Sequence, residues 1–137
     1  MAVRRITPQE AKTLLDEGYV YVDVRSIPEF EKGHPQGAFN VPLLNMGPGG
    51  MSPNPEFAAV MEKSFPKDAR LIIGCKMGGR SAQASQLLES LGYTALVDQK
   101  GGFEGGPGNP GWVPAGLPVS AQADADHSYE GLRAKAR

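Results

Sequence analysis

The stretch Leu71–Ser81 has the sequence LIIGCKMGGRS and joins a strand signal to a helix start. Its first three residues are apolar and form a run too short for a helix, which favours a buried strand. Beyond its glycines, apolar residues recur at helical spacing, at Ala84, Leu87, Leu88 and Leu91. A buried strand that passes through a short loop into a helix is the beginning of a βαβ unit, so this stretch predicts an α/β fold.

Further helices are predicted upstream of this stretch. Residues 7–10 form a capping box with proline at the first helical position, and Gly18 follows as the stop signal. A short helical segment is predicted over residues 28–33. Asn54 is expected to cap another helix, with Pro55 at its first position.

Three further segments have the composition of short strands: residues 20–24, 38–41 and 95–97. Because strands and helices alternate along the chain, the connections are crossovers. The sheet is therefore expected to be mainly parallel, with helices on both faces. In such a sheet, sites form outside the carboxyl ends of the strands, and Cys75 lies just beyond one of those ends.

Glycine and proline gather in two segments between these elements. The chain has 18 Gly and 12 Pro among 137 residues, and the segments 45–55 and 101–116 are expected to be loops. Trp112 is the one large apolar residue that is expected to anchor the second loop. We expect one domain over residues 1–119 and a polar C-terminal tail over residues 120–137 that is frayed or weakly helical.

The single cysteine and the balanced charge exclude several classes of protein. One cysteine makes neither an internal disulfide nor a cysteine-based zinc site, so no metal is expected. With 14 basic and 15 acidic residues, the chain lacks the charge excess that nucleic acid or anionic lipid attracts. No apolar run approaches the ~20 residues of a membrane span, and the basic start lacks the apolar segment of a secretory signal. We expect a cytoplasmic protein and, since no apolar surface stripe is evident, a monomer.

Cys75 begins a loop whose composition favours an anion-binding site. Gly78 and Gly79 allow consecutive backbone N–H groups to turn inward, and the following helix adds its unpaired N–H groups and the positive end of its dipole. Lys76 and Arg80 bring two positive charges. Together these groups are expected to stabilise a thiolate. The alternative is that Cys75 is a small buried apolar residue, as a lone cysteine most often is.

Several motifs in this order resemble the rhodanese-homology family, over about residues 5–119. Residues 75–81 are similar to the family's active-site loop in its Cys-x-x-Gly-x-Arg-Ser form. The chain also resembles the family's first signature, at Asp23-Val24-Arg25, Glu29-Phe30, Gly33-His34, Gly37-Ala38 and Asn40-Val41-Pro42. Its closing segment is resembled by Ala84, Leu87, Gly92-Tyr93, Val97 and Gly101-Gly102-Phe103, with Trp112 as its tryptophan displaced by an insertion.

The resemblance implies a single-domain sulfurtransferase with a five-stranded, mainly parallel sheet and helices on both faces, a three-layer arrangement. In that family a cysteine thiolate takes the outer sulfur of a donor such as thiosulfate and carries it as a persulfide. A thiol or cyanide, or an acceptor protein, then removes the sulfur, and no cofactor is implied. Here Cys75 would be the nucleophile. The backbone donors for the persulfide would be Lys76, Met77, Gly78, Gly79 and Arg80.

Supporting roles are expected for Asp23, Arg25 and Ser81. Asp23 and Arg25 are expected to form a structural ion pair at a strand end. Two roles remain open for the Arg80 side chain: it attracts an anionic donor, as Lys76 also would, or it pairs with a carboxylate such as Asp23.

Three features depart from the family's pattern. Gly74 stands where an aromatic or small apolar residue is commoner, so a looser loop entrance is expected. His34-Pro35 replaces the usual His-apolar pair, and His34 is expected to fix a loop because transfer from a thiolate needs no general base. The segments 45–55 and 101–116 are longer than a minimal domain needs. Three roles are considered for them: shaping the mouth of the pocket, recognising a partner, or packing without a function.

Other functions are weighed against the sulfurtransferase. A cysteine phosphatase needs five residues between cysteine and arginine, whereas only four separate Cys75 from Arg80. The shorter loop favours a sulfur atom over a phosphoryl group. An arsenate reductase uses similar anion chemistry but would need an external resolving thiol. A non-enzymatic persulfide carrier or interaction module would use the same chemistry at Cys75.

Overall fold

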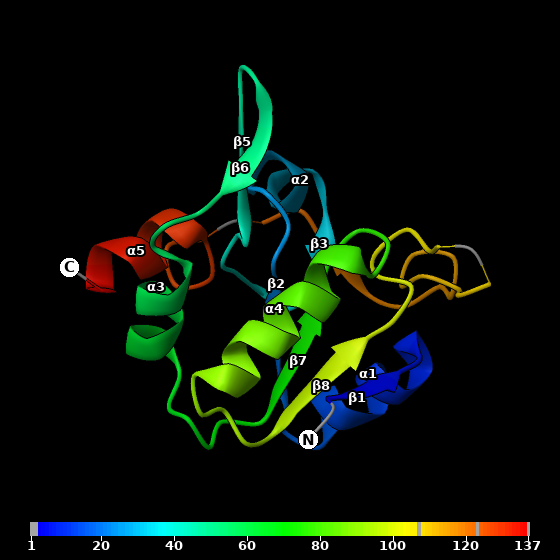
Figure 1. The fold of residues 1–137 in the computed structure, drawn as a ribbon. Helices are drawn as coiled ribbons and strands as arrows, with labels where there is room; N and C mark the ends of the chain where they lie inside the picture. Colours follow the sequence, from blue (N-terminus) through cyan, green and yellow to red (C-terminus); the bar gives the residue numbers. More distant parts are fainter. Residues whose placement is uncertain (1–2, 107, 123, 137) are drawn as a thin grey trace.

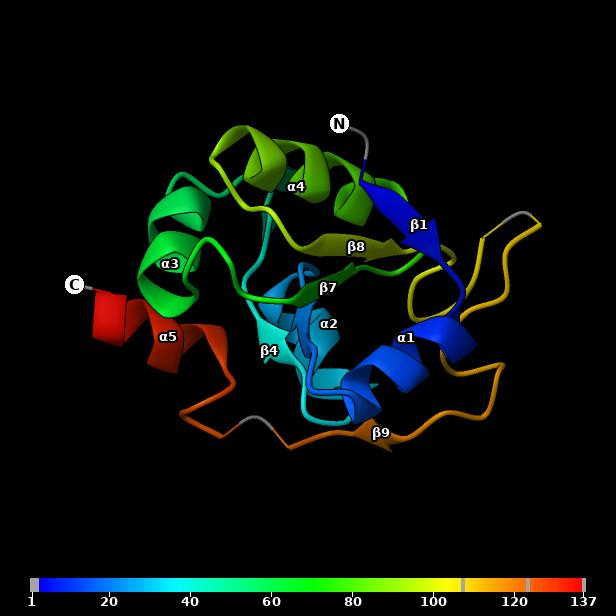
Figure 2. The ribbon, with the colours of Figure 1, turned by 90° about the horizontal axis from the view of Figure 1, so that it is seen from below.

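The computed structural model describes residues 3–106, 108–122 and 124–136; residues 1–2, 107, 123 and 137 lie outside it, so the ends of the predicted domain and tail are not described. The elements follow in chain order, most of them labelled in Figure 1 and the strands β4 and β9 in Figure 2: β1 (Arg4–Ile6), α1 (Pro8–Asp16), β2 (Val20–Asp23), α2 (Ile27–Lys32), β3 (His34–Pro35), β4 (Phe39–Asn40), β5 (Leu44–Gly47), β6 (Gly50–Pro53), α3 (Phe57–Ser64), β7 (Leu71–Gly74), α4 (Gly79–Ser90), β8 (Leu96–Gln99), β9 (Val119–Ser120) and α5 (Tyr129–Ala136).

Within the described residues, the main sheet has five strands in the order β1-β8-β7-β2-β4. Every neighbouring pair is parallel, which confirms the predicted five-stranded parallel sheet. Asp23 of β2 pairs with Gly74 of β7, so these two strands end side by side. The loops that follow them therefore share one edge of the sheet, where parallel sheets place their sites.

Alternate residues of the central strands face opposite sides of the sheet. Val22 and Ile73 join one buried cluster with side chains of α3, α4 and α5. Tyr21 and Ile72 join a second cluster with side chains of α1 and α2. Figure 2 shows α3 and α4 on one side of the sheet and α1 and α2 on the other. Helices on both faces, as predicted, make three layers.

Helix α1 begins as the capping box predicts. The Thr7 side chain accepts a hydrogen bond from the Glu10 amide at 3.1 Å, and the Glu10 side chain accepts one from the Thr7 amide at 2.9 Å. Pro8 stands at the first helical turn. These bonds satisfy amides that a helix start otherwise leaves unpaired.

Two strand assignments differ from the sequence prediction. The edge strand β1 was not predicted, because it has only three residues and two of them are exposed, so it shows no apolar pattern. The segment 45–55, predicted to be a loop, is largely the antiparallel hairpin β5–β6, in which Gly47 pairs with Gly50. Gly50 has φ +101°, which allows the chain to reverse tightly there.

Asn54 does not cap α3 as predicted. The helix begins two residues later than expected, with Glu56 as its N-cap. The Asn54 amide group instead donates to the Pro42 carbonyl at 2.9 Å and to the Tyr129 hydroxyl at 3.0 Å. This residue therefore joins the loop after β4 to the C-terminal helix.

The polar C-terminal segment, expected to be frayed or weakly helical, contains the helix α5. Tyr129 and Leu132 lie one helical turn apart on its inner face, and both are buried. The helix packs against α3, and Arg133 Nε lies 2.8 Å from the Glu56 carboxylate. The side chains of Tyr129 and Leu132 pack the helix against the core. The rest of the segment is polar, so its overall composition does not indicate a packed helix. None of the described helices is long and apolar enough to cross a membrane.

Candidate active site

Cys75 follows β7 directly and opens the loop that leads into α4. The residue is only 2% exposed. Its Sγ accepts a hydrogen bond from the Gly78 amide at 3.1 Å. Gly78 is the N-cap of α4 and has φ +109°, a conformation that glycine adopts without the steric cost of a side chain. The strand thus delivers the sulfur to the N-terminus of a helix.

The other amides of this loop give it the character of an anion site. Within the described part of the chain, the amide N–H groups of Lys76, Met77, Gly79 and Arg80 have no hydrogen-bond acceptor. Helix N-termini leave such groups unpaired and add a partial positive charge. The loop that carries Sγ therefore contains several amides that are free to bind an anion.

A second loop, at residues 101–104, packs behind this one and binds two of its carbonyl groups. The Phe103 amide donates to the Cys75 carbonyl at 2.7 Å, and the Glu104 amide donates to the Lys76 carbonyl at 2.9 Å. Gly102, with φ +63°, lies so close that a Cβ there would stand 2.5 Å from the Cys75 and Lys76 carbonyl oxygens. Part of the glycine-rich segment 101–116 thus supports the cysteine loop.

Asp23 and Arg25, at the end of β2, form the ion pair expected from the sequence. Arg25 Nη2 lies 2.7 Å from Asp23 Oδ2, and both side chains are buried. The same nitrogen donates to the Gly33 carbonyl at 2.6 Å, and the guanidinium stacks over the Phe103 ring at 4.3 Å from its centroid. Every charge here has a partner, so the pair ties β2 to the loop that backs Cys75.

Arg80 pairs with Glu29 rather than with Asp23. Its Nη1 and Nη2 lie 2.7 and 3.0 Å from Glu29 Oε1 and Oε2, a two-point contact. Burial raises the pKa of Glu29, but hydrogen bonds from Arg80 and Ser26 outweigh burial and lower that pKa from 4.5 to about 2. The sequence allowed a carboxylate partner for Arg80, and the structure identifies it on α2.

The low pKa of Glu29 gives a prediction for the pH dependence of stability. A pKa lowered by folding means that the ion pair stabilises the fold above pH ~4.5 and stops doing so as the pH falls towards ~2. Glu29→Gln should therefore lower the free energy of unfolding at pH 7, with a smaller difference from wild type at pH 3. Urea unfolding at both pH values measures this, with Glu31→Gln, exposed on the same helix, as the control. Equal losses at the two pH values would contradict the prediction.

Gly74 does not loosen the entrance to the loop, contrary to the expectation from sequence. The space that its side chain would occupy is filled by Tyr21: a Cβ on Gly74 would stand 1.9 Å from the Tyr21 hydroxyl oxygen. That hydroxyl donates to the Gln99 side chain, whose amide group donates to the Gly102 carbonyl at 3.0 Å. Hydrogen bonds between buried polar groups therefore connect Tyr21 on β2, through Gln99 on β8, to Gly102 in the loop behind Cys75.

We predict that Gly74→Ala destabilises the protein by about 2–3 kcal/mol, because the new Cβ and the Tyr21 ring cannot both keep their places. Tyr21→Phe in the same chain should recover part of this loss, since it removes the nearest atom. Chemical unfolding of the single and double variants gives the coupling energy. Gly49→Ala, which meets nothing within 4 Å, is the control. Additive effects of the two substitutions would contradict the packing argument.

The remaining predicted residues lie around the loop or away from it. Lys76 Nζ is 3.9 Å from Glu104 Oε1, with both side chains about half exposed, and Met77 is exposed. The Ser81 hydroxyl donates to the Gly78 carbonyl at 3.2 Å. His34 is buried against the Phe30 ring and hydrogen-bonds the Phe30 carbonyl at 2.7 Å, which holds the segment after α2 as expected.

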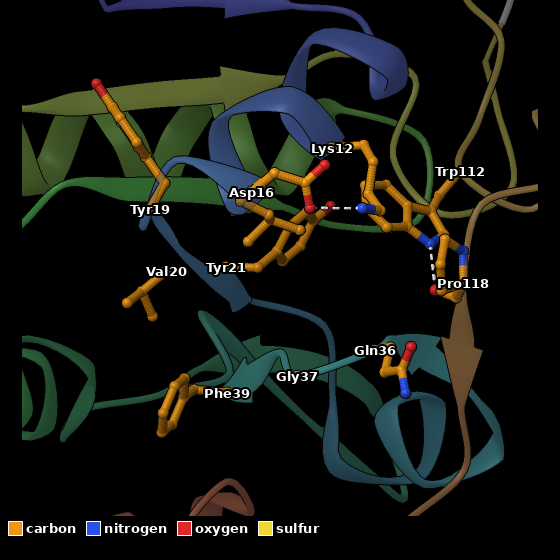
Figure 3. Close-up of a pocket in the computed structure, with 11 residues that line it drawn as sticks. Lys12, Asp16, Tyr19, Val20, Tyr21, Gln36, Gly37, Phe39, Trp112 and Pro118 are labelled. Carbon is orange, nitrogen blue, oxygen red and sulfur yellow. Dashed lines mark hydrogen bonds and ion pairs between the residues drawn. The ribbon is translucent and has the colours of Figure 1, made fainter.

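Trp112 is the buried anchor of its loop, as predicted. Its Nε1 donates to the Pro118 carbonyl at 2.7 Å, and its ring packs edge-on against Tyr21. Figure 3 shows both beside a pocket of about 350 Å³. That pocket is also lined by Tyr19 and Val20 at the start of β2, and no residue of the Cys75 loop lines it.

The described residues contain no group of three or more His, Cys, Asp or Glu side chains that could hold a metal ion. The fold and the loop define an α/β protein with a buried thiol at the N-terminus of a helix. The rhodanese-like domain family matches residues 7–106, and the chain belongs to that family.

Known members resemble the chain over most of its length. "Thiosulfate sulfurtransferase 16, chloroplastic" from Arabidopsis thaliana is 40% identical over 111 residues, which cover 81% of this chain and 88% of that protein. "Thiosulfate sulfurtransferase GlpE" from Haemophilus influenzae (strain PittEE) is 29% identical over 119 residues, covering 87% and 96%. The crystal structure of Rv0390 from M. tuberculosis superposes with a TM-score of 0.74 at 27% identity, covering 89% and 100%.

Proposed function

We propose that this protein is a sulfurtransferase that carries sulfane sulfur on Cys75 as a persulfide. The Cys75 thiolate attacks the outer sulfur of a small donor such as thiosulfate. A new sulfur–sulfur bond forms, the sulfur–sulfur bond of the donor breaks, and its electron pair leaves with sulfite. A thiolate or cyanide then attacks the outer sulfur of the persulfide and regenerates the Cys75 thiolate. Neither step needs an external oxidant or reductant.

The observation that carries this proposal is the set of unpaired amides around a buried thiol. The Gly78 amide already donates to Sγ at 3.1 Å. The amides of Gly79 and Arg80, at the start of α4, remain for the outer sulfur, and donors fixed before the reaction stabilise developing negative charge without reorganisation. The persulfide is an anion, and this cradle needs no metal or organic group to hold it.

The contacts of Arg80 and Lys76 support a proposal in which the backbone provides most of the substrate binding. Nη1 and Nη2 of Arg80 both bind the Glu29 carboxylate. This side chain therefore fixes the loop and is not free to bind an anionic donor. Lys76 is more exposed and more loosely paired, at 3.9 Å from Glu104. It can attract an anionic donor from the rim of the site. The names of the two sulfurtransferase relatives support the same donor chemistry.

The proposal is tested by following the sulfur. Wild-type protein is incubated with thiosulfate, and the intact mass and the peptide that contains Cys75 are examined for a gain of one sulfur atom. Cyanide is then added and thiocyanate is measured. A persulfide on Cys75 that yields thiocyanate at each turnover is the expected result, and no gain in mass would overturn the proposal.

The same assay separates the rival functions. A persulfide that forms but turns over only when an acceptor protein is supplied indicates a carrier. Release of phosphate from an aryl phosphate, or reduction of arsenate with added thiol, without any persulfide, indicates the other two classes. The four-residue spacing between Cys75 and Arg80 argues against the phosphatase.

A further inference from the structure

The carbonyl group of Gly78 accepts three hydrogen bonds. The Ala82 amide donates at 3.3 Å in the helical pattern, the Ser81 hydroxyl at 3.2 Å, and Arg5 Nη2 at 3.3 Å. The first two donors belong to α4 itself. Arg5 comes from the edge strand β1, at the far end of the sequence. A cationic donor therefore holds the first peptide unit of the helix that faces Cys75.

Arg5 is itself held by a buried carboxylate. Its Nε lies 2.8 Å from Asp98 Oδ2, and Asp98, on β8, is 1% exposed. Within the described residues, the other oxygen of Asp98, Oδ1, has no hydrogen-bond partner. Burying a carboxylate is costly when it is paired at one oxygen only. Asp98 thus holds Arg5 next to the Gly78 carbonyl, and the same carboxylate also interacts with the Ser81 side chain in the first turn of α4.

The other end of the same peptide unit is the Gly79 amide. In a trans peptide the C=O and N–H groups point in opposite directions. Because the Gly78 carbonyl points along α4 to Ala82, the Gly79 N–H points out of the helix start, towards the Cys75 loop. Arg5 therefore touches the peptide on the side away from the sulfur. A hydrogen bond to a carbonyl polarises the peptide and strengthens its N–H as a donor.

We propose that Arg5 and Asp98 are positioning residues for sulfur transfer: Asp98 orients Arg5, and Arg5 fixes and polarises the Gly78–Gly79 peptide so that the Gly79 amide binds the outer sulfur of the Cys75 persulfide. This inference rests on the proposed sulfurtransferase function and adds two residues that do not touch the substrate. Sequence patterns do not reveal them, because they lie on neighbouring strands that are 93 residues apart.

The test compares four variants of the full chain with wild type. Arg5→Gln removes the cation, and Arg5→Lys keeps the charge but cannot reach Asp98 and Gly78 with a forked group. Asp98→Asn weakens the hold on Arg5. Arg4→Gln is the matched control, since it makes the same charge change on the same strand, where neighbouring side chains point to opposite faces.

Three measurements are made on each variant: kcat and KM for thiosulfate with cyanide, the lifetime of the Cys75 persulfide by mass spectrometry, and the position of the Gly79 amide signal in NMR spectra. Removing a direct oxyanion donor costs ~100-fold or more in kcat, so an indirect support should cost about tenfold. We expect Arg5→Gln to lower kcat by that factor with little change in KM, to shorten the persulfide lifetime and to shift the Gly79 signal. Arg5→Lys should be intermediate, and Arg4→Gln should match wild type.

The variants Asp98→Asn and Arg5→Gln should not add their effects in the double variant, since they act through one contact. An unchanged kcat with a lower melting temperature would show a merely structural role and overturn the proposal. So would a rise in KM that disappears in high salt, which indicates attraction of the donor by charge. If wild type forms no persulfide, the proposed function fails. The contact between Arg5 and the Gly78–Gly79 peptide is tested separately by the NMR signal of the Gly79 amide. If this signal does not shift in Arg5→Gln, the proposed effect of Arg5 on that peptide is wrong, whether or not a persulfide forms.

Discussion

Cys75→Ser should reduce the transfer of sulfur from thiosulfate to cyanide by about a thousandfold or more, because it removes the nucleophile on which both steps depend. A serine hydroxyl stays protonated near neutral pH and cannot form the persulfide. Its size is close to that of the thiol, and the Gly78 amide that now binds Sγ can donate to the hydroxyl instead. We therefore expect the variant to fold normally.

The chain offers an unusually clear readout for this variant. Cys75 is its single cysteine, so any thiol labelling or gain of sulfur in the wild type reports on one atom. The measurements are thiocyanate production, intact mass after thiosulfate treatment, and thermal unfolding. Turnover of Cys75→Ser above about one per cent of wild type would contradict a persulfide mechanism. A loss of folding would be detected by unfolding and circular dichroism, and Cys75→Ala then serves as a second variant.

Gly102→Ala should impair both stability and activity, because its Cβ would enter the backbone of the cysteine loop. The new atom would stand 2.5 Å from the Cys75 and Lys76 carbonyl oxygens, and neither is the flexible end of a side chain. The backing loop or the cysteine loop must move. We expect a loss of about 2–4 kcal/mol in the free energy of unfolding and a fall in kcat of about tenfold or more, since displaced amides no longer fit the sulfur.

Gly116→Ala is the matched control for this substitution. Gly116 has φ +74°, close to the +63° of Gly102, but a Cβ there meets nothing within 4 Å. It should cost only the ~1 kcal/mol of a left-handed backbone conformation and leave kcat unchanged. The difference between the two variants isolates the close approach to Cys75. Equal losses in both would contradict the idea that Gly102 shapes the cysteine loop.

The Cys75 loop could be predicted from sequence because consecutive residues form it. A strand, a cysteine, two glycines and a helix start follow one another between Leu71 and Arg80, and the anion character of such a loop is a property of the backbone. The capping box at Thr7 and the anchoring role of Trp112 are confirmed for similar reasons. Each rests on a pattern within one element.

The supports of that loop could not be predicted, because they depend on which distant residues meet. Glu29 is one acidic residue among many in the sequence, and only the packing of α2 against the cysteine loop makes it the partner of Arg80. The fit of Gly74 to Tyr21 needs the register of two strands. The strands β5 and β6 contain no β-branched residues. The glycines and prolines of this segment therefore predict a turn, and nothing in its sequence predicts the two strands.

The position of β1 at the edge of the sheet also bears on how the protein is made. Among the described strands β1 comes first along the chain, yet it pairs with β8, and the Arg5–Asp98 contact spans 93 residues. Closing so long a chain segment is slow compared with forming local contacts. Because its partner strand follows so much later along the chain, β1 also stays unpaired during synthesis until β8 has left the ribosome. A chain released before that point would have Cys75, Gly78 and Gly79, but its β1 would be unpaired and could not hold the start of α4.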